Sequence, residues 1–229
     1  MEQKIRDWVS RDAAGYGYLL DFYRRGARVC YLGDDALILK NDALNICYAG
    51  GAFVDVPELH NTALTLTESK EMADTLMAEG CYQMLMICRQ TYYPGKEPPQ
   101  AESPGVTVRP LTMDDLDFVL ENYHHPGAFE SHIRGRIEEG MLGAEVDGEL
   151  AGFIGVHKEG SMGLLEILPQ FRRRGIAKVL EAALIRQQLE RGSWPYGHVI
   201  VGNHASDSLQ DKMGMVFDDR RLMYWLCPE

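Results

Sequence analysis

The stretch LLEILPQFRRRGIAKVLEAALIRQQLE, residues 164–190, decides the fold. An apolar run of strand length ends at Pro169, and a helix with apolar residues at helical spacing begins at Gly175. The first N–H groups of a helix have no partners within it, and the helix dipole adds positive potential there. A strand, a basic turn and a helix in this order therefore predict an anion site that a diphosphate fits.

The basic turn also has a plainer interpretation, as a solvated run of the charged residues Arg172, Arg173 and Arg174. Its position between the strand and a small-residue helix start favours phosphate binding. Gly175 and Ala177 matter because a large side chain there would keep phosphates from the backbone. The chain lacks the Walker GK[ST] in this turn and GxGxxG as well, which disfavours ATP hydrolysis and dinucleotide binding.

Outward from this stretch, residues after 105 alternate between predicted strands and helices. The expected strands are 106–109, 142–146, 150–156, 162–168, 198–201 and 222–226. The expected helices are 112–122, capped by Thr112, 131–139, 175–191 and 206–213. Asp147 and Gly148 form a hairpin turn between two of the strands. This order predicts an α/β fold of the α+β type with a mixed sheet.

The amino-terminal half is predicted to be a smaller α+β domain. A helix is expected over 5–25, interrupted by Gly15 and Gly17, and a second over 68–79 behind a cap at Thr67. Strands are expected at 28–32, 36–39, 45–49 and 83–90, the first three as an antiparallel meander. YYPGKEPPQAESPG, residues 92–105, holds four prolines and two glycines and is predicted to be a linker. The predicted domains are 1–103 and 104–229.

Composition and charge limit the classes of function. With 45% apolar and 25% charged residues, the chain is an ordinary globular protein. Its 23 basic and 34 acidic residues give a net charge of −11, which argues against nucleic-acid binding and favours a cationic substrate. The five cysteines follow no CxxC or zinc-finger spacing, so we expect reduced thiols and no metal site.

Two further patterns bear on location. The amino terminus carries charges where a signal peptide has its apolar core, and no run of 18 apolar residues occurs. A cytoplasmic protein with no membrane partner is therefore expected. The sequence leaves monomer and homodimer open.

The arginine turn at residues 172–177 and a second segment at residues 199–217 together resemble motifs of the GNAT superfamily of acyl-CoA-dependent N-acyltransferases. Its pattern Arg/Gln-x-x-Gly-x-Gly/Ala is matched from Arg172 to Ala177. VIVGNHASDSLQDKMGMVF, residues 199–217, resembles the family's second conserved region, with Asn203 at the helix start. The resemblance covers about residues 105–227. The first half resembles the degenerate GNAT-like domain of two-domain members, because its own glycine-arginine turn is missing.

The resemblance implies acetyl-CoA, or another short acyl-CoA, as co-substrate. Pantetheine would lie between the strands ending near Leu168 and Val201, and amides near Leu168 would polarise the thioester oxygen. One residue departs from the family: Gln210 stands where a Tyr often acts as general acid, and glutamine cannot take that role. The implied cofactor-binding residues are Ile167, Leu168, Arg172, Arg173, Arg174, Gly175, Ile176, Ala177, Asn203 and Ser206.

Acylation requires a neutral amine, so a base near the acceptor is useful. Glu166 is the leading candidate, because it is the acid within the apolar strand; the alternative is an edge-facing or salt-bridged glutamate. His124 and His125 fall in the loop that lines the acceptor pocket in this family, or they simply make that loop polar. His204 could supply the acid or help to start a helix.

These observations predict an N-acetyltransferase in which a primary amine attacks the thioester directly. The acceptor is a small molecule or a peptide. The alternative is a CoA-binding sensor or regulatory domain without turnover, which Gln210 favours. Thiol release over a panel of amines separates the two.

Overall fold

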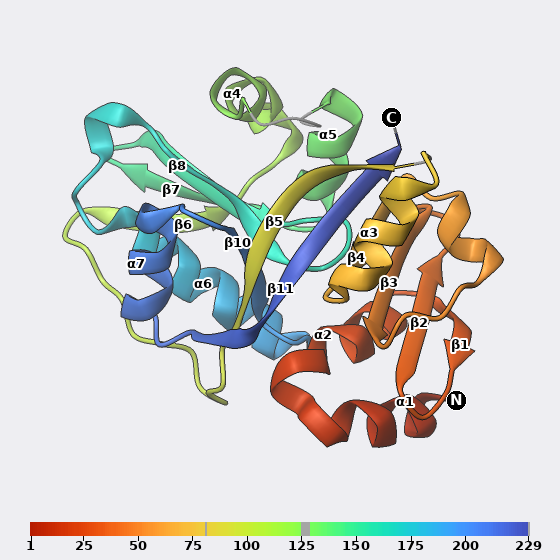
Figure 1. Ribbon diagram of the computed structural model, residues 1–229. Helices are drawn as coiled ribbons and strands as arrows, with labels where there is room; N and C mark the ends of the chain where they lie inside the picture. The colour runs from red at the N-terminus through yellow and green to blue at the C-terminus, as the bar shows by residue number, and fades with distance from the viewer. Residues whose placement is uncertain (81, 125–128, 229) are drawn as a thin grey trace. The chain divides into compact units, whose positions relative to one another are not determined.

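The computed structural model describes residues 1–80, 82–124 and 129–228, and its mixed α/β composition confirms the predicted fold class. The chain forms two compact units (Figure 1). Unit 1 comprises Met1–Tyr92, His198–His204 and Phe217–Glu229, and unit 2 comprises Tyr93–Gly197 and Ala205–Val216. This division differs from a single boundary at residue 103, because the end of the chain returns to unit 1 through long-range strand pairing.

Unit 1 contains the helices and strands of residues 1–92, together with most of the last strand, β11. In chain order they are α1 (Glu2–Val9), η1 (Ser10–Asp12), α2 (Ala13–Arg24), β1 (Arg28–Leu32), β2 (Ala36–Asn41), β3 (Ile46–Gly51), η2 (Pro57–His60), β4 (Leu64–Thr67), α3 (Lys70–Ala78), β5 (Tyr82–Tyr92) and β11 (Val216–Pro228).

The helix expected over 5–25 is divided at η1 into α1 and α2. Asp12 is the N-cap of α2, and its carboxylate accepts a hydrogen bond from the N–H of Gly15 at 3.3 Å. The cap of α3 also differs from expectation. Ser69, two residues beyond Thr67, accepts the N–H of Met72, while Thr67 accepts the N–H of Ser69. Both differences are local, since several capping side chains compete within a few residues.

The strands of unit 1 follow the order β1-β2-β3-β4-β11-β5. The first three form the predicted antiparallel meander, and β3 then pairs with β4 in parallel. Sequence patterns missed β4, which has only four residues. They also predicted only residues 222–226 of β11, whose Tyr224 lies opposite Thr67 of β4.

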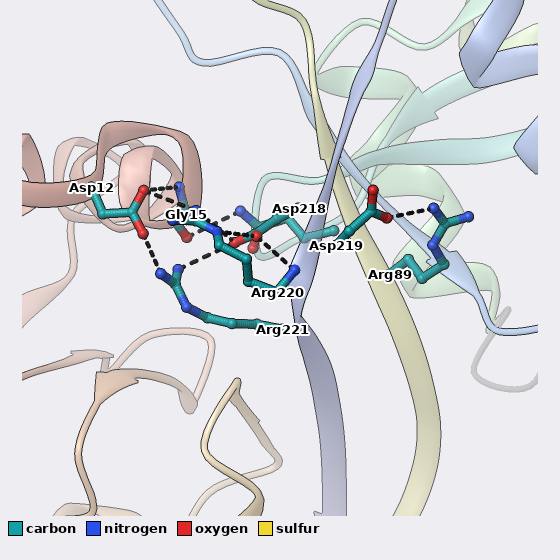
Figure 2. A network of polar contacts seen from close by, with 8 residues as sticks. Asp12, Gly15, Arg89, Asp218, Asp219, Arg220 and Arg221 are labelled. Carbon is teal, nitrogen blue, oxygen red and sulfur yellow. Dashed lines mark hydrogen bonds and ion pairs between the residues drawn. The ribbon is translucent and has the colours of Figure 1, made fainter.

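β11 is held to α2 by the charge network in Figure 2. Asp12 accepts hydrogen bonds from both Arg220 and Arg221, and the same two arginines contact the buried carboxylate of Asp218. Arg89 of β5 donates to Asp219 at 2.9 Å. Charged hydrogen bonds thus join three segments of unit 1 that lie far apart in sequence.

Unit 2 holds the segment that contains the arginine turn. Its helices and strands are β6 (Val106–Pro110), η3 (Met113–Asp115), α4 (Leu116–Asn122), α5 (Glu130–Glu138), β7 (Leu142–Val146), β8 (Glu149–Val156), β9 (Met162–Ile167), η4 (Pro169–Phe171), α6 (Ile176–Glu190), β10 (Tyr196–Ile200), which begins here, and α7 (His204–Lys212), which ends here.

The predicted hairpin turn and the predicted helix cap of this unit are both confirmed. Asp147 and Gly148 both have positive φ, as a type I′ hairpin turn requires. Thr112 and Asp115 form a reciprocal capping box, in which the Asp115 carboxylate also binds Arg109. The strand order is β10-β9-β8-β7-β6.

Helices cover both faces of these strands in Figure 1: α6 and α7 lie on one side, α4 and α5 on the other. One buried cluster joins α6 to β7 and β8 through Leu180, Leu184 and Ile154. A second cluster, with Phe153 and Ile133, lies beneath α4 and α5. Across the described ranges, no helix combines the length and the apolar character needed to cross a membrane.

Candidate functional site

The arginine turn connects β9 to α6, and several of its backbone N–H groups have no backbone acceptor among the described residues. The N–H of Arg172 closes the turn on the Pro169 carbonyl at 3.3 Å, and helical bonding begins with the Lys178 N–H to Gly175 at 3.1 Å. Gly175 is the N-cap of α6 and supplies no side-chain cap. Among the described residues, none accepts a backbone hydrogen bond from residues 173–177. These five N–H groups at a helix start are suited to an anion.

Gly175 has φ of 79° and ψ of 0°, in the left-handed region that glycine adopts at little cost. A side chain at this position would project toward Ser103, whose Cβ and Oγ lie 3.9 Å from an added Cβ. Ser103 also donates a hydrogen bond to the Arg174 carbonyl at 2.6 Å. The predicted linker therefore contacts the turn, a role that no sequence pattern signalled.

β9 carries a bulge beside the turn. Phe153 pairs with Glu166 and Gly155 with Gly163, so two steps along β8 match three along β9. Leu164 takes up the extra residue with φ of 52°. The bulge interrupts the hydrogen-bond ladder of β9 just before the turn. At such an interruption, backbone groups of a strand can point toward a ligand.

Leu168 itself does not offer the expected free amide. Its N–H donates to the Ala151 carbonyl at 2.9 Å. The Leu168 N–H is therefore engaged by β8, and the role of amides near Leu168 in polarising the thioester oxygen stays a prediction. Of the two predicted cofactor-binding residues just before the turn, Ile167 also uses its carbonyl, which accepts Arg172 Nε at 2.9 Å.

Glu166 forms an ion pair with the first arginine of the turn. Its Oε1 accepts Arg172 Nη2 at 3.0 Å, and its side chain is 25% exposed. The environment is thus less apolar than the strand pattern suggests, and the salt-bridged alternative describes the structure. The role of Glu166 as a base stays a prediction.

The loop expected to line the acceptor pocket begins at Tyr123. Burial, together with the nearby carboxylates of Glu159 and Glu166, raises the pKa of Tyr123 to about 12. His124 is exposed, and His125 lies outside the described residues. Glu159 was missed by the sequence analysis. It is buried in the β8–β9 turn, where burial raises its pKa to about 7 although Ser161 donates to it.

Gln210 is buried and turned into the helix layer. Its Nε2 donates to Glu181 of α6 at 2.6 Å, while its Oε1 is buried with no hydrogen-bond partner in the described chain. Burial raises the pKa of Glu181 to about 7, and the Gln210 hydrogen bond opposes that rise. The residue in the usual tyrosine position therefore serves α6–α7 packing.

The remaining predicted residues follow β10. Asn203 and His204 belong to unit 1 and Ser206 to unit 2, all at or just before the start of α7. The N–H of Asn203 donates to Ile200 at 2.9 Å, and that of His204 to Gly202 at 3.0 Å. Their contacts with a cofactor, and the pantetheine path near Val201, stay predictions.

Comparison with known proteins identifies one family model and several solved structures. Residues 140–226 match the family model for FR47-like proteins, and no curated protein matches the chain in sequence. A Drosophila protein of known structure is 15% identical, with a TM-score of 0.69 over 99% of this chain and 95% of its own.

Two other solved structures are similar over most of this chain. A GNAT-family protein from Novosphingobium aromaticivorans is 16% identical, with a TM-score of 0.59 over 94% of this chain and 97% of that one. A GCN5-related N-acetyltransferase from Kribbella flavida is 14% identical, with a TM-score of 0.55 over 93% of both chains. At these identities the likeness establishes the fold that the sequence resemblance predicted.

Proposed function

We propose that this chain is an N-acyltransferase of the GNAT superfamily that uses acyl-CoA, with acetyl-CoA as the favoured donor and a primary amine as acceptor. The observation that carries the proposal is the uncapped start of α6, where the N–H groups of residues 173–177 donate no backbone hydrogen bond within the described chain. A diphosphate is an anion of the size and charge that such a turn binds.

Each part of the turn has a stated task toward that ligand. Gly175 adopts the left-handed conformation at the start of α6, and its missing side chain leaves room for phosphate. Arg173 and Arg174 are exposed and add positive charge. Ile176 is buried and anchors the helix start in the core. The small side chain of Ala177 leaves space for a phosphate next to the backbone.

The chemistry follows from direct attack. The amine nitrogen bonds to the thioester carbonyl carbon, the carbon–sulfur bond breaks, and the CoA thiolate leaves and is protonated. Glu166 receives the proton of the amine, directly or through water. Because Gln210 is buried and bonded to Glu181, we assign thiolate protonation to water or to His204.

We propose that unit 1 binds no CoA and shapes or supports the enzyme. Its parallel strands β3 and β4 remain paired at four successive positions, from Ile46 with Leu64 to Ala49 with Thr67. The connection between them holds only the short η2, so this unit has no counterpart of α6 among its described residues. In unit 2, by contrast, the parallel strands β9 and β10 pair at one position, Gly197 with Met162, among the described residues.

The acceptor class follows from charge. A net charge of −11 attracts cationic amines over long range, and two acids, Glu159 and Glu166, lie near Tyr123 at the start of the acceptor loop. We therefore propose a cationic small molecule or peptide amine. A cytoplasmic location suits this co-substrate.

A CoA-binding sensor without turnover is the second candidate, and Gln210 is the observation that favours it. One experiment separates the two. The protein is titrated with acetyl-CoA calorimetrically, and thiol release is then measured over a panel of mono-, di- and polyamines. Saturable binding with amine-dependent release supports the enzyme, binding without release supports the sensor, and no binding contradicts both.

A further inference from the structure

Arg172, the first residue of the arginine triplet, contacts a carboxylate in this structure. Its Nε donates to the Ile167 carbonyl at 2.9 Å, and its Nη2 donates to Glu166 at 3.0 Å. The guanidinium therefore lies back along the end of β9. By contrast, Arg174 lies over the Phe171 ring, with its Cζ 5.7 Å from the centroid.

The Arg172–Glu166 contact is open to competition. The arginine side chain is 56% exposed, and an exposed ion pair contributes little to stability, so the guanidinium can exchange one anion for another at small cost. A diphosphate bound to residues 173–177 would carry more charge than one carboxylate and accept two parallel guanidinium hydrogen bonds. Both anions would then require the same side chain.

We propose that Arg172 is shared between Glu166 and the CoA diphosphate, so that binding of the diphosphate withdraws Arg172 from Glu166 and leaves this carboxylate unpaired beside the reacting atoms. This inference rests on the proposed function and assigns Arg172 as a positioning residue. It couples the filling of the phosphate turn to the readiness of the base. The amine then meets an unpaired Glu166 only when CoA is in place.

Thermodynamic linkage makes the proposal measurable without any turnover. If Glu166 competes with the diphosphate, removal of its charge must tighten CoA binding, and it must do so only when Arg172 is present. Unacylated CoA is the probe. Its dissociation constant is measured by calorimetry for wild type, Glu166→Gln, Arg172→Gln and the double variant.

We expect Glu166→Gln to lower the dissociation constant by about two- to fivefold in the wild-type background, the range for an exposed ion pair. In the Arg172→Gln background the same change should have no effect. Glu190→Gln, at the far end of α6, removes the same charge and should leave the affinity unchanged in both backgrounds.

Equal tightening in both backgrounds would mean that Glu166 repels the ligand through space, and it would overturn the proposal. Unchanged affinity in Glu166→Gln would overturn it as well, while leaving the CoA site intact. Wild type that binds no CoA contradicts the proposed function together with the inference. If Arg172→Gln does not fold, Arg172→Ala replaces it in the cycle.

Discussion

Asp12, the N-cap of α2, is ion-paired with Arg221 of β11 across 209 positions of sequence. Arg221 also lies over the Tyr16 ring, with its Cζ 4.5 Å from the centroid (Figure 2 shows the charged partners). The amino-terminal helices and β11 are therefore parts of one unit.

A fragment of residues 1–103 should consequently fail to fold. It lacks β11, which pairs with β4 and contributes Tyr224 and Leu226 to the core of unit 1. We expect circular dichroism to show no cooperative thermal transition. A second fragment that covers 1–92 joined by a flexible linker to 217–229 should restore the transition; a cooperative melt of 1–103 alone would contradict this account.

Substitution of Gly175 by Glu should abolish stabilisation by CoA. The left-handed backbone disfavours any side chain, and the added carboxylate would face the phosphates. In wild type, acetyl-CoA at 100 times its dissociation constant should stabilise the fold by about 2.7 kcal/mol, visible as a rise in Tm.

The matched control for that experiment is Gly192→Glu. Gly192 follows α6 with φ of 67° and has nothing within 4 Å of an added Cβ. It carries a similar backbone strain far from the turn, so the Tm rise should persist. A folded Gly175→Glu protein that retains the rise would refute the phosphate assignment.

Glu166→Gln should reduce turnover about 10²- to 10⁴-fold, because the amide keeps the shape of the side chain but cannot accept the amine's proton. The expected loss lies in kcat, with the acyl-CoA KM no higher than in wild type. Stopped-time assays of thiol release with the true acceptor measure both. Near wild-type kcat would assign deprotonation to solvent or to a histidine.

Glu181 should make stability fall as pH rises. Burial raises its folded pKa to about 7 from 4.5, so its contribution is complete below pH 4.5 and is lost as pH rises to about 7. Glu181→Gln cannot titrate. Between pH 4.5 and 8, the free energy of unfolding of this variant should rise relative to that of wild type by on the order of 3 kcal/mol, measured by denaturant unfolding.

The exposed Glu190, on the same helix, gives the control for Glu181. Glu190→Gln removes an exposed carboxylate from the same helix and tests whether the gain is specific to the buried one. A Glu181→Gln protein that shows no gain relative to wild type would mean that folding does not raise the pKa of Glu181.

His60 should stabilise unit 1 at low pH. Its Nε2 lies 2.5 Å from Asp55 and its Nδ1 3.0 Å from Glu79. A hydrogen bond to Asp55, followed by the charges of both acids, raises the pKa of His60 above 6.5. Only the imidazolium can donate to both acids, so the stabilisation is complete below pH 6.5 and is lost as pH rises through the folded pKa.

His60→Gln should therefore lower Tm at pH 5.5, by an amount equivalent to about 0.5–1 kcal/mol, and have little effect at pH 9. The exposed His124, replaced by Gln, serves as the control. An equal loss of Tm at both pH values would show that the His60 contribution is packing rather than charge.

Features that depend on neighbouring residues could be predicted from the amino-acid sequence. The type I′ turn at Asp147 and Gly148, the capping box at Thr112 and the turn before α6 all arise from backbone preferences and hydrogen bonds within a few positions. Apolar periodicity likewise predicted most strands of unit 2, because burial on a face recurs at a fixed spacing.

Contacts between segments that are distant in sequence became known from the folded chain. The return of β11 to unit 1, the hydrogen bond from Ser103 to Arg174, and the pairing of Gln210 with Glu181 all join residues separated by more than 20 positions. Even the Arg172–Glu166 contact depends on the path of the turn, which places a cation beside an acid that the strand pattern left in an apolar setting. Such contacts form because the core brings elements together, and a side chain's local sequence does not specify the partner that the folded chain presents to it.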